Sequence, residues 1–262
     1  MIPFSKYVGC GNDFILIDRR TSDFYPDPQA IQALCDRHYG IGADGLLLLD
    51  SSVDADWKMS IFNADGNEAQ MCGNGIRCLG RFLQHLGEQR KKVAIETRAR
   101  TIWIEIEPEF VTVFMGEPLS IEWDKPLHLS GNTLTVHLID TGAPHAVLLV
   151  DDVGQVDIAT LGRQIRNFPG LDVNATFASI EGDIITVRTF ERGVEGETLA
   201  CGTGASAAAL AFARKTGQQK YAVKTRSGKI LHISCSPLKM SGEARYLFNG
   251  QFPVQSLKIK SL

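Results

Sequence analysis

Two cysteines, each on a glycine-rich turn, are the sequence feature that most constrains the fold of this chain. Residues 71–75 read Met-Cys-Gly-Asn-Gly, and residues 200–204 read Ala-Cys-Gly-Thr-Gly. Each turn opens into a segment typical of a helix, so Cys72 and Cys201 are both predicted at a helix N-terminus. The N–H groups and the dipole at such a position lower the pKa of a thiol and bind carboxylates. Two such thiols suggest a paired acid and base.

The surroundings of the two cysteines are repeated as well, at an offset close to the 129 residues that separate Cys72 from Cys201. Phe-Asn-Ala-Asp-Gly at residues 62–66 precedes the first, and Phe-Glu-Arg-Gly at residues 190–193 precedes the second. Each half also begins with a turn followed by an apolar strand, at residues 9–18 and 142–151. We therefore expect two copies of one unit, related by a pseudo-two-fold axis, whose cysteines face one ligand from opposite sides.

Composition and net charge favour a protein that acts on a small molecule. The 262 residues are 44% hydrophobic, enough for one large core or two moderate ones, and the formal net charge is −3. Nothing in this balance indicates a nucleic acid or a membrane surface as partner, so a small-molecule substrate is expected. The N-terminal residues lack the pattern of an export signal, and no apolar run reaches membrane-spanning length. These features predict a cytoplasmic enzyme with reduced cysteines.

Strand signals outnumber helix signals, and turns at residues 181–183 and 226–228 indicate hairpins. We expect an α+β fold of two pseudo-symmetric strand-rich halves, each a mostly antiparallel sheet wrapped around a central helix, with the active site in the cleft between them. The first half spans residues 1–117 and is completed by a C-terminal strand within 250–262; the second spans 118–249. Strands are predicted at residues 14–17, 46–49, 57–61, 102–106, 111–114, 134–139, 146–150, 184–190, 221–224, 230–234, 244–248 and 256–260.

Four helices are predicted, at residues 28–37, 75–86, 158–166 and 203–215. The last is apolar on every side and is therefore expected to be buried. The second has an apolar stripe and leaves three polar residues available to solvent or ligand: Arg77, Arg81 and Gln84.

Two alternative site types find little support. Cys35 and His38 have a spacing that could hold zinc, but no second pair follows them, and structural zinc needs four ligands. The two glycine-rich turns do not continue as the G-x-G-x-x-G dinucleotide fingerprint. No metal and no cofactor are expected.

Taken in order, the motifs resemble those of diaminopimelate epimerase, a family of cofactor-independent amino-acid racemases and epimerases. The resemblance runs nearly end to end. It rests on residues 11–14 (GNDF), 37–44 (RHYGIGAD), 62–66 (FNADG), 71–77 (MCGNGIR), 142–145 (GAPH), 173–174 (VN), 191–193 (ERG) and 197–205 (ETLACGTGA).

The resemblance implies an isomerase that interconverts LL- and meso-2,6-diaminopimelate without pyridoxal phosphate, for lysine and peptidoglycan precursor synthesis, and it implies a homodimer. One cysteine thiolate removes the Cα proton and the opposing thiol delivers a proton to the other face, with His145 tuning Cys72 and Glu191 tuning Cys201. Backbone N–H groups of the two turns hold the developing negative charge. The residues implied to bind substrate are Asn12, Asn63, Gly73, Asn74, Asn174, Glu191, Arg192, Gly202 and Thr203.

Two departures from the family pattern bear on substrate choice. Gly45 stands where the family usually has Gln, and Ala143 stands where it usually has Asn. One alternative is therefore a racemase with shifted or broadened specificity, for glutamate, aspartate or another amino acid. Another is a binding protein of the same fold without activity, although the presence of both cysteines argues against it. Read without the resemblance, His145 is more simply a buried structural histidine.

Overall fold

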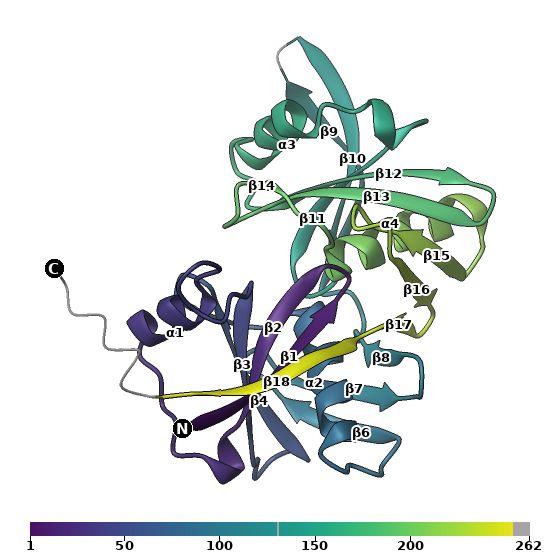
Figure 1. The fold of residues 1–262 in the computed structure, drawn as a ribbon. Coiled ribbons are helices and arrows are strands. Elements are labelled where there is room, and N and C mark those ends of the chain that lie inside the picture. Colours follow the sequence, from purple (N-terminus) through teal and green to yellow (C-terminus); the bar gives the residue numbers. More distant parts are fainter. Residues whose placement is uncertain (130, 254–262) are drawn as a thin grey trace, which may run out of the picture. The chain divides into compact units, whose positions relative to one another are not determined.

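The chain divides into two compact units (Figure 1). The computed structural model describes residues 1–129 and 131–253. Of the described residues, unit 1 comprises 1–113 and 243–253, and unit 2 comprises Phe114–Gly242. The strand expected at residues 256–260 lies outside the described residues, but the chain does return to unit 1 through strand β18 (Arg245–Phe252), which pairs antiparallel with β1 (Ile2–Gly9).

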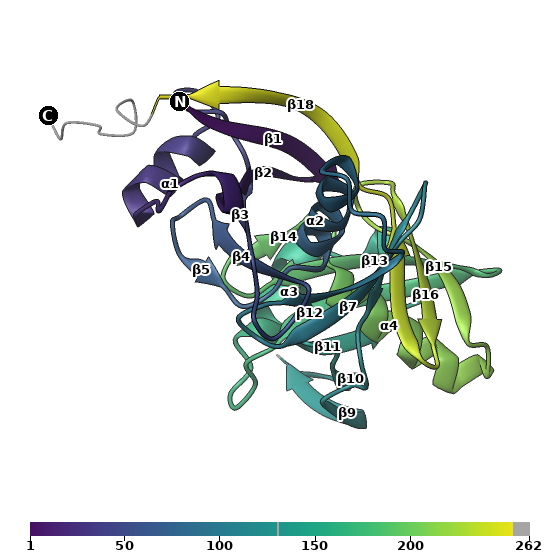
Figure 2. The same cartoon turned by 90° about the horizontal axis from the view of Figure 1, so that it is seen from below.

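The sheet of unit 1 is mixed and curls around one helix. Two neighbouring pairs, β2 with β3 and β4 with β6, are parallel, whereas the others are antiparallel. Helix α2 packs against β1, β2 and β7, and Figure 2 shows it beside β1 and β18. The elements are β2 (Asn12–Asp18), α1 (Pro28–Cys35), β3 (Gly45–Asp50), β4 (Trp57–Asn63), β5 (Glu68–Ala69), α2 (Gly73–His85), β6 (Lys92–Glu96), β7 (Thr101–Ile106) and β8 (Val111–Phe114), with a short 3-10 helix at Arg19–Thr21.

Unit 2 repeats this order of pairings. Its parallel pairs are β11 with β12 and β13 with β15, and helix α4 packs against β11, β13 and β16. The elements are β9 (Ser120–Leu129), β10 (Asn132–Asp140), β11 (Pro144–Leu149), α3 (Ile158–Arg166), β12 (Asn174–Glu181), β13 (Ile184–Glu191), β14 (Gly196–Glu197), α4 (Gly202–Thr216), β15 (Lys220–Lys224), β16 (Ile230–Cys235) and β17 (Leu238–Gly242), with a 3-10 helix at Val153–Gln155.

The repeated order confirms the internal repeat predicted from the cysteine turns. In each unit a helix, α1 or α3, connects the first parallel pair, and a two-residue strand, β5 or β14, precedes the central helix. Most strand pairs in both units are antiparallel, as expected, and the first parallel pair of each unit is joined by a crossover helix, because such a helix connects strands that run in the same direction. Each crossover helix covers its own apolar core, with Phe4, Ile15 and Leu46 among the buried residues in unit 1 and Val136, Phe177 and Phe190 among those in unit 2.

All four predicted helices are present, with ends shifted by up to two residues. Local chemistry accounts for their ends. Asp27 caps α1 by accepting a hydrogen bond from the Ala30 N–H at 2.8 Å, and Pro28 occupies the first turn, where its missing N–H costs nothing. Gly217 ends α4 with a φ of +80°, a conformation that glycine adopts without strain. Helix α4 is buried, as predicted, and no helix among the described residues is long and apolar enough to span a membrane.

Three polar residues of α2 were predicted to be available to solvent or ligand, and for two of them the prediction of exposure is wrong. Arg77 is fully buried and Arg81 is 6% exposed, while Gln84 is half-buried and accepts a hydrogen bond from Arg81. The sheet curls far enough around α2 to cover this face of the helix. A buried guanidinium must be satisfied by hydrogen bonds, and Arg77 donates to the Gly73 carbonyl group and to the Asn74 side chain.

The strands that sequence patterns missed have mixed or short patterns. They are β1, β5, β6, β9, β12, β14 and β17. Pro3 interrupts the pattern of β1, and β9 carries mostly exposed residues without a buried face that alternates regularly. Both hairpins predicted at glycine-containing turns are present, between β12 and β13 and between β15 and β16.

Candidate active site

Each cysteine turn places its thiol at the residue immediately before a helix. Cys72 precedes α2 with φ −143° and ψ 120°, and Cys201 precedes α4 with φ −122° and ψ 111°. Both cysteines are half-buried. Their carbonyl groups accept the first helical hydrogen bonds, from Ile76 and Ala205, each at 2.9 Å. The N–H groups of the first helical turn have no acceptor within the helix, so each thiol sits beside donors suited to a carboxylate or an oxyanion.

Cys72 is hydrogen-bonded to a backbone amide, and the first turn that it begins carries the side-chain amide of Asn74. Cys72 Sγ accepts a hydrogen bond from the Gly75 N–H at 3.4 Å. Asn74, in the first turn of α2, donates from Nδ2 to Asn12 Oδ1 at 2.5 Å, and Asn12 Nδ2 donates to Asp44 Oδ2 at 3.1 Å. Two of the predicted substrate-binding amides are thus brought together by side-chain contact, although they are 62 residues apart.

Asn63 and Gly45 lie at the same edge of the unit 1 sheet as Asn12. Asn63 ends β4 and pairs with Gly45, which begins β3 and pairs in turn with Phe14. The side chain of Asn63 is exposed. A Cβ added at Gly45 would lie 2.5 Å from the Phe62 carbonyl oxygen, a distance that real Cβ atoms do not show. The backbone here therefore admits glycine alone, and a glutamine at this position would need a locally different chain path.

The surroundings of Cys201 are built from hydroxyl groups, an imidazole and a carboxyl group. Cys201 Sγ lies 3.4 Å from Thr203 Oγ1 and 4.0 Å from His145 Nε2. His145 is fully buried, with Nε2 2.9 Å from Thr203 Oγ1 and Nδ1 2.8 Å from Thr176 Oγ1. Burial, together with the charge of Arg192, lowers the pKa of His145 to about 3, so this imidazole is neutral at physiological pH.

Glu191 ends β13 next to the same thiol. Its carboxyl group is hydrogen-bonded to Cys201 and accepts a hydrogen bond from the Thr198 hydroxyl. Burial raises the pKa of Glu191 above its ordinary value, and these two hydrogen bonds oppose the rise. A buried carboxyl group that is hydrogen-bonded to a thiol is placed to exchange a proton with it.

Asn174 and Arg192, two further predicted residues of unit 2, make polar contacts with other residues of that unit. Asn174 donates to the Pro144 carbonyl at 3.0 Å and accepts from the Arg192 backbone N–H at 2.9 Å. The Arg192 guanidinium is paired with Asp172 at 2.5 Å in an ion pair that is open to solvent. An exposed ion pair contributes little and is readily exchanged, so Arg192 can turn to a substrate carboxylate without a large cost.

The structure therefore gathers the predicted residues into two groups. In unit 1, Asn74 follows Cys72 and Gly73 in the first cysteine turn and contacts Asn12, and Asn63 lies at the same end of the sheet. In unit 2, His145, Thr203 and Glu191 contact one another or Cys201 around the second turn, which includes Gly202, and Asn174 contacts Arg192. His145 contacts residues of its own unit, so its predicted influence on Cys72 stays a prediction. Sequence patterns gave no role to Asp44, Thr176 and Thr198, and they placed Arg77 only on a face open to solvent or ligand. These four residues hold the predicted residues in place.

Comparison with known proteins places this geometry in a family. The diaminopimelate epimerase family model matches residues 4–121 and 137–247. A diaminopimelate epimerase of Archaeoglobus fulgidus is 38% identical and covers 98% of both chains. One of Rippkaea orientalis is 40% identical over 95% of this chain and 98% of its own.

A solved structure with the same fold is a phenazine biosynthesis protein of Bacillus anthracis. Its TM-score is 0.73 at 16% identity, over 97% of this chain and 99% of that protein. At this identity the likeness concerns the fold alone. Both cysteine turns and the residues gathered around them fall inside the ranges matched by the family model, and on that match the chain belongs to the diaminopimelate epimerase family.

Proposed function

We propose that this protein interconverts LL-2,6-diaminopimelate and meso-2,6-diaminopimelate, in the biosynthesis of lysine and of peptidoglycan precursors. The observation that carries the proposal is the match to diaminopimelate epimerases over nearly the whole chain, with a cysteine at each of two equivalent helix N-termini. Inverting one carbon without a cofactor needs one group to remove a proton and another to return one from the opposite face, and each unit supplies one thiol.

In the proposed mechanism Cys72 and Cys201 exchange protons with the substrate Cα, one as thiolate base and one as thiol acid. The roles reverse with the direction of reaction, so each thiol must be able to hold either state. The first-turn N–H groups of α2 and α4 would stabilise the charge that develops on the substrate carboxylate. Glu191 would take or supply the Cys201 proton, and Arg192 would bind a carboxylate of the substrate.

The experiment that tests the function is NMR detection of Cα-proton exchange in D₂O, in reducing buffer without pyridoxal phosphate. LL-diaminopimelate, meso-diaminopimelate, L-glutamate and L-aspartate would be compared. We expect deuteration with inversion of diaminopimelate alone. Comparable turnover of glutamate or aspartate would favour the broadened racemase, for which Ala143 and Gly45 would then be the residues to vary.

A matched pair of variants separates an enzyme from a binding protein. Cys72→Ser removes a proposed base, whereas Cys235→Ser removes a half-buried thiol on β16 outside both cysteine turns. Loss of exchange in the first and retention in the second supports catalysis. Diaminopimelate binding without exchange in the unmodified protein would identify a binding protein.

We also propose that the protein acts in the cytoplasm as a homodimer. A mechanism that needs free thiols is suited to a reducing compartment. Strand β18 exposes the large side chains Tyr246, Leu247 and Phe248, each more than 40% accessible, and exposed side chains of this size fit an interface. Sedimentation of the unmodified protein beside Leu247→Glu tests this, and a monomer in both cases would contradict it.

A further inference from the structure

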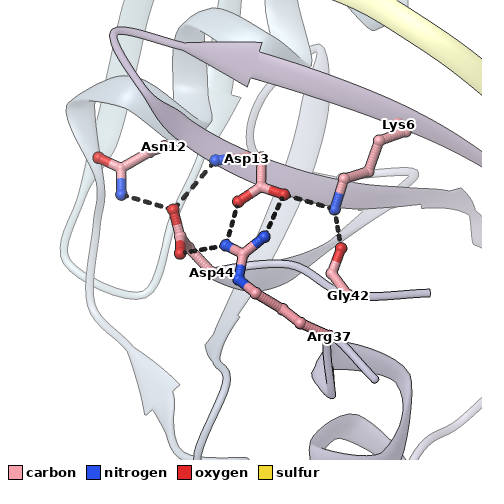
Figure 3. Close-up of polar contacts among 6 residues, drawn as sticks. All are labelled: Lys6, Asn12, Asp13, Arg37, Gly42 and Asp44. Atoms are coloured by element: carbon pink, nitrogen blue, oxygen red, sulfur yellow. Dashed lines mark hydrogen bonds and ion pairs between the residues drawn. The ribbon is translucent and has the colours of Figure 1, made fainter. Parts of the chain in front are cut away.

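A series of hydrogen bonds links the buried Arg77 to the carboxylate of Asp44 through two side-chain amides. Arg77 donates to Asn74 Oδ1 at 2.7 Å, and Asn74 Nδ2 donates to Asn12 Oδ1 at 2.5 Å. Asn12 Nδ2 then donates to Asp44 Oδ2 at 3.1 Å, the last contact of the series, drawn in Figure 3. We refer to these four residues, Arg77, Asn74, Asn12 and Asp44, as the amide relay.

The two ends of the relay determine its direction. A guanidinium can only donate hydrogen bonds, and an ionised carboxylate can only accept them, whereas an amide can do either at its two ends. With Arg77 at one end, Asn74 must turn its oxygen toward the guanidinium and its nitrogen toward Asn12. With Asp44 at the other end, Asn12 must turn its nitrogen toward the carboxylate. Rotating both amides by 180° would place the Asn74 N–H groups against those of Arg77, and the Asn12 oxygen against the Asp44 carboxylate.

Both ends are themselves held firmly. Arg77 is fully buried and also donates to the Gly73 carbonyl at 3.0 Å and to Cys10 Sγ at 3.2 Å. Asp44 accepts from the Asp13 backbone N–H at 3.1 Å and from Arg37 at 2.7 Å (Figure 3). Arg37 in turn binds the Asp13 carboxylate, which also pairs with Lys6 at 2.8 Å. Neither end can move without breaking several charge-assisted hydrogen bonds.

The amide relay leaves part of the hydrogen-bonding capacity of the Asn12 side chain available to a ligand. An amide nitrogen has two N–H groups and an amide oxygen has two lone pairs, so one N–H and one lone pair remain after the bonds to Asp44 and Asn74. The donor lies on the Asp44 side and the acceptor on the Asn74 side. A substrate amino acid brings an ammonium group that donates and a carboxylate that accepts, and only one placement of these groups matches this polarity.

We propose that Asp44 and Arg77 are positioning residues for the substrate, because they set which edge of the Asn12 amide accepts from its ammonium group and which donates to a carboxylate. The inference rests on the proposed function, since it takes Asn12 as a substrate ligand. Neither Asp44 nor Arg77 needs to touch the substrate. Their effect is exerted through the orientation of Asn12 and Asn74, so it falls on substrate binding and hardly on proton transfer.

The test compares Asp44→Asn with Asp50→Asn. The first variant replaces the obligate acceptor by an amide that can face either way. The second makes the same chemical change at a carboxylate of unit 1 that binds Arg19 at 2.7 and 2.8 Å, away from the relay. Thermal unfolding midpoints establish that both fold. We expect Asp44→Asn to raise KM for diaminopimelate about tenfold with kcat within a factor of two, and Asp50→Asn to leave both within a factor of two. A tenfold change corresponds to about 1.4 kcal/mol, the scale of one lost hydrogen bond.

A second measurement follows the relay without relying on activity. The side-chain N–H₂ signals of Asn12 and Asn74 are observed by ¹H–¹⁵N NMR of protein labelled at asparagine. Asp44→Asn should shift the signals of both residues, including Asn74, which it does not touch, and Asp50→Asn should shift neither. Arg77→Lys, which keeps a donor but loses the planar fork, should shift Asn74 more than Asn12.

The outcomes separate this inference from the proposed function. If the unmodified protein inverts diaminopimelate but Asp44→Asn leaves KM unchanged, the inference fails and the function stands. If Asn74 signals do not respond to Asp44→Asn, the relay does not transmit orientation and the inference also fails. Shifts of both amides in a protein that does not act on diaminopimelate would overturn the function and support the relay as an orienting device.

Discussion

The two cysteine turns share a backbone but differ in what surrounds them. Both thiols stand on an extended residue before a buried helix, and the strands around them pair in the same order. Yet Cys72 caps its own helix by accepting a hydrogen bond from the Gly75 N–H, whereas Cys201 makes no such cap and lies beside an imidazole, a hydroxyl group and a carboxyl group.

The difference shows which parts of a repeated unit can change independently. The turn and helix start are set by a few adjacent glycines, so they are retained when the unit is repeated. The groups around each thiol come from the ends of other strands. At the end of β4 unit 1 has Asn63, and at the end of β13 unit 2 has Glu191. A single substitution at a strand end changes the chemistry of one unit without altering its fold.

The largest expected effect tests whether the two thiols are equally necessary. Cys72→Ser and Cys201→Ser should each lower kcat by at least about 10³-fold, because a serine hydroxyl is a far weaker base than a thiolate and acid–base groups contribute 10²- to 10⁴-fold. Kinetics of Cα-proton exchange measure this, with Cys235→Ser as the control. Near-full activity of either Cys72→Ser or Cys201→Ser would contradict the two-thiol mechanism, because that cysteine would then take no part in proton transfer.

A smaller effect is expected for the carboxyl group that only unit 2 carries. Glu191→Gln should lower kcat about 10²-fold, because the neutral amide can no longer exchange a proton with Cys201. Glu195→Gln, at an exposed glutamate that pairs with Arg166, is the matched control. A pH profile of kcat that is identical before and after Glu191→Gln would show that Glu191 has no part in the proton transfer.

Equivalent glycines in the two helices should respond differently to one added methyl group. A Cβ at Gly204 would lie 2.9 Å from Thr189 Oγ1 and 3.0 Å from Thr176 Oγ1, within the hydrogen-bonded group around His145. A Cβ at Gly75 would meet the methyl ends of Ile61 and Leu47, both at 3.3 Å, and the Cβ of Cys72 at 3.5 Å.

Gly204→Ala should therefore lower the free energy of unfolding by about 1–3 kcal/mol through overpacking. Gly75→Ala should change it by less than about 1 kcal/mol, because the better helix propensity of alanine offsets a slight displacement. Urea unfolding measures both values. Equal losses in the two variants would mean that the two helix starts are packed alike.

The two units should also differ in acid sensitivity. His145 has a pKa of about 3 in the folded protein, against 6.5 for an ordinary histidine, because it is buried. The unfolded chain binds this proton first, so stability is full above pH 6.5 and is lost as pH falls from 6.5 toward 3, at up to about 1.4 kcal/mol per pH unit.

Asp13 of unit 1 behaves differently. Its ion pairs with Arg37 and Lys6 outweigh burial and lower its pKa from 3.8 to about 2. Its contribution is full above pH 3.8 and is lost only as pH falls below that value toward 2. Urea unfolding at pH 7, 6 and 5 should show a decline that His145→Gln flattens and Asp13→Asn leaves in place. A decline of the same slope in His145→Gln would assign it to other groups.

Much of this architecture could be predicted from short-range patterns. The helix at Ile158–Arg166 was predicted to the residue, and the two cysteine helices within two residues, because caps, glycine turns and apolar periodicity are local signals. The parallel pairs of each sheet were not anticipated, since parallel pairing depends on how a crossover helix brings distant strands together. Several edge strands were missed for a related reason, because exposed strands lack the apolar alternation that marks a buried one.

In the candidate site, too, some features follow from local sequence and others from tertiary contacts. The sequence by itself determined the two thiols, their glycine turns and their helix starts, because these lie within five adjacent residues. Only the tertiary structure decided that Arg77 is buried beneath the Cys72 turn and that Asn74 reaches Asn12, which is 62 residues away in the chain. Whether one end of a side-chain amide donates or accepts depends on the group that lies next to it in space. A residue's donor or acceptor role is therefore settled by the partners that folding places beside it.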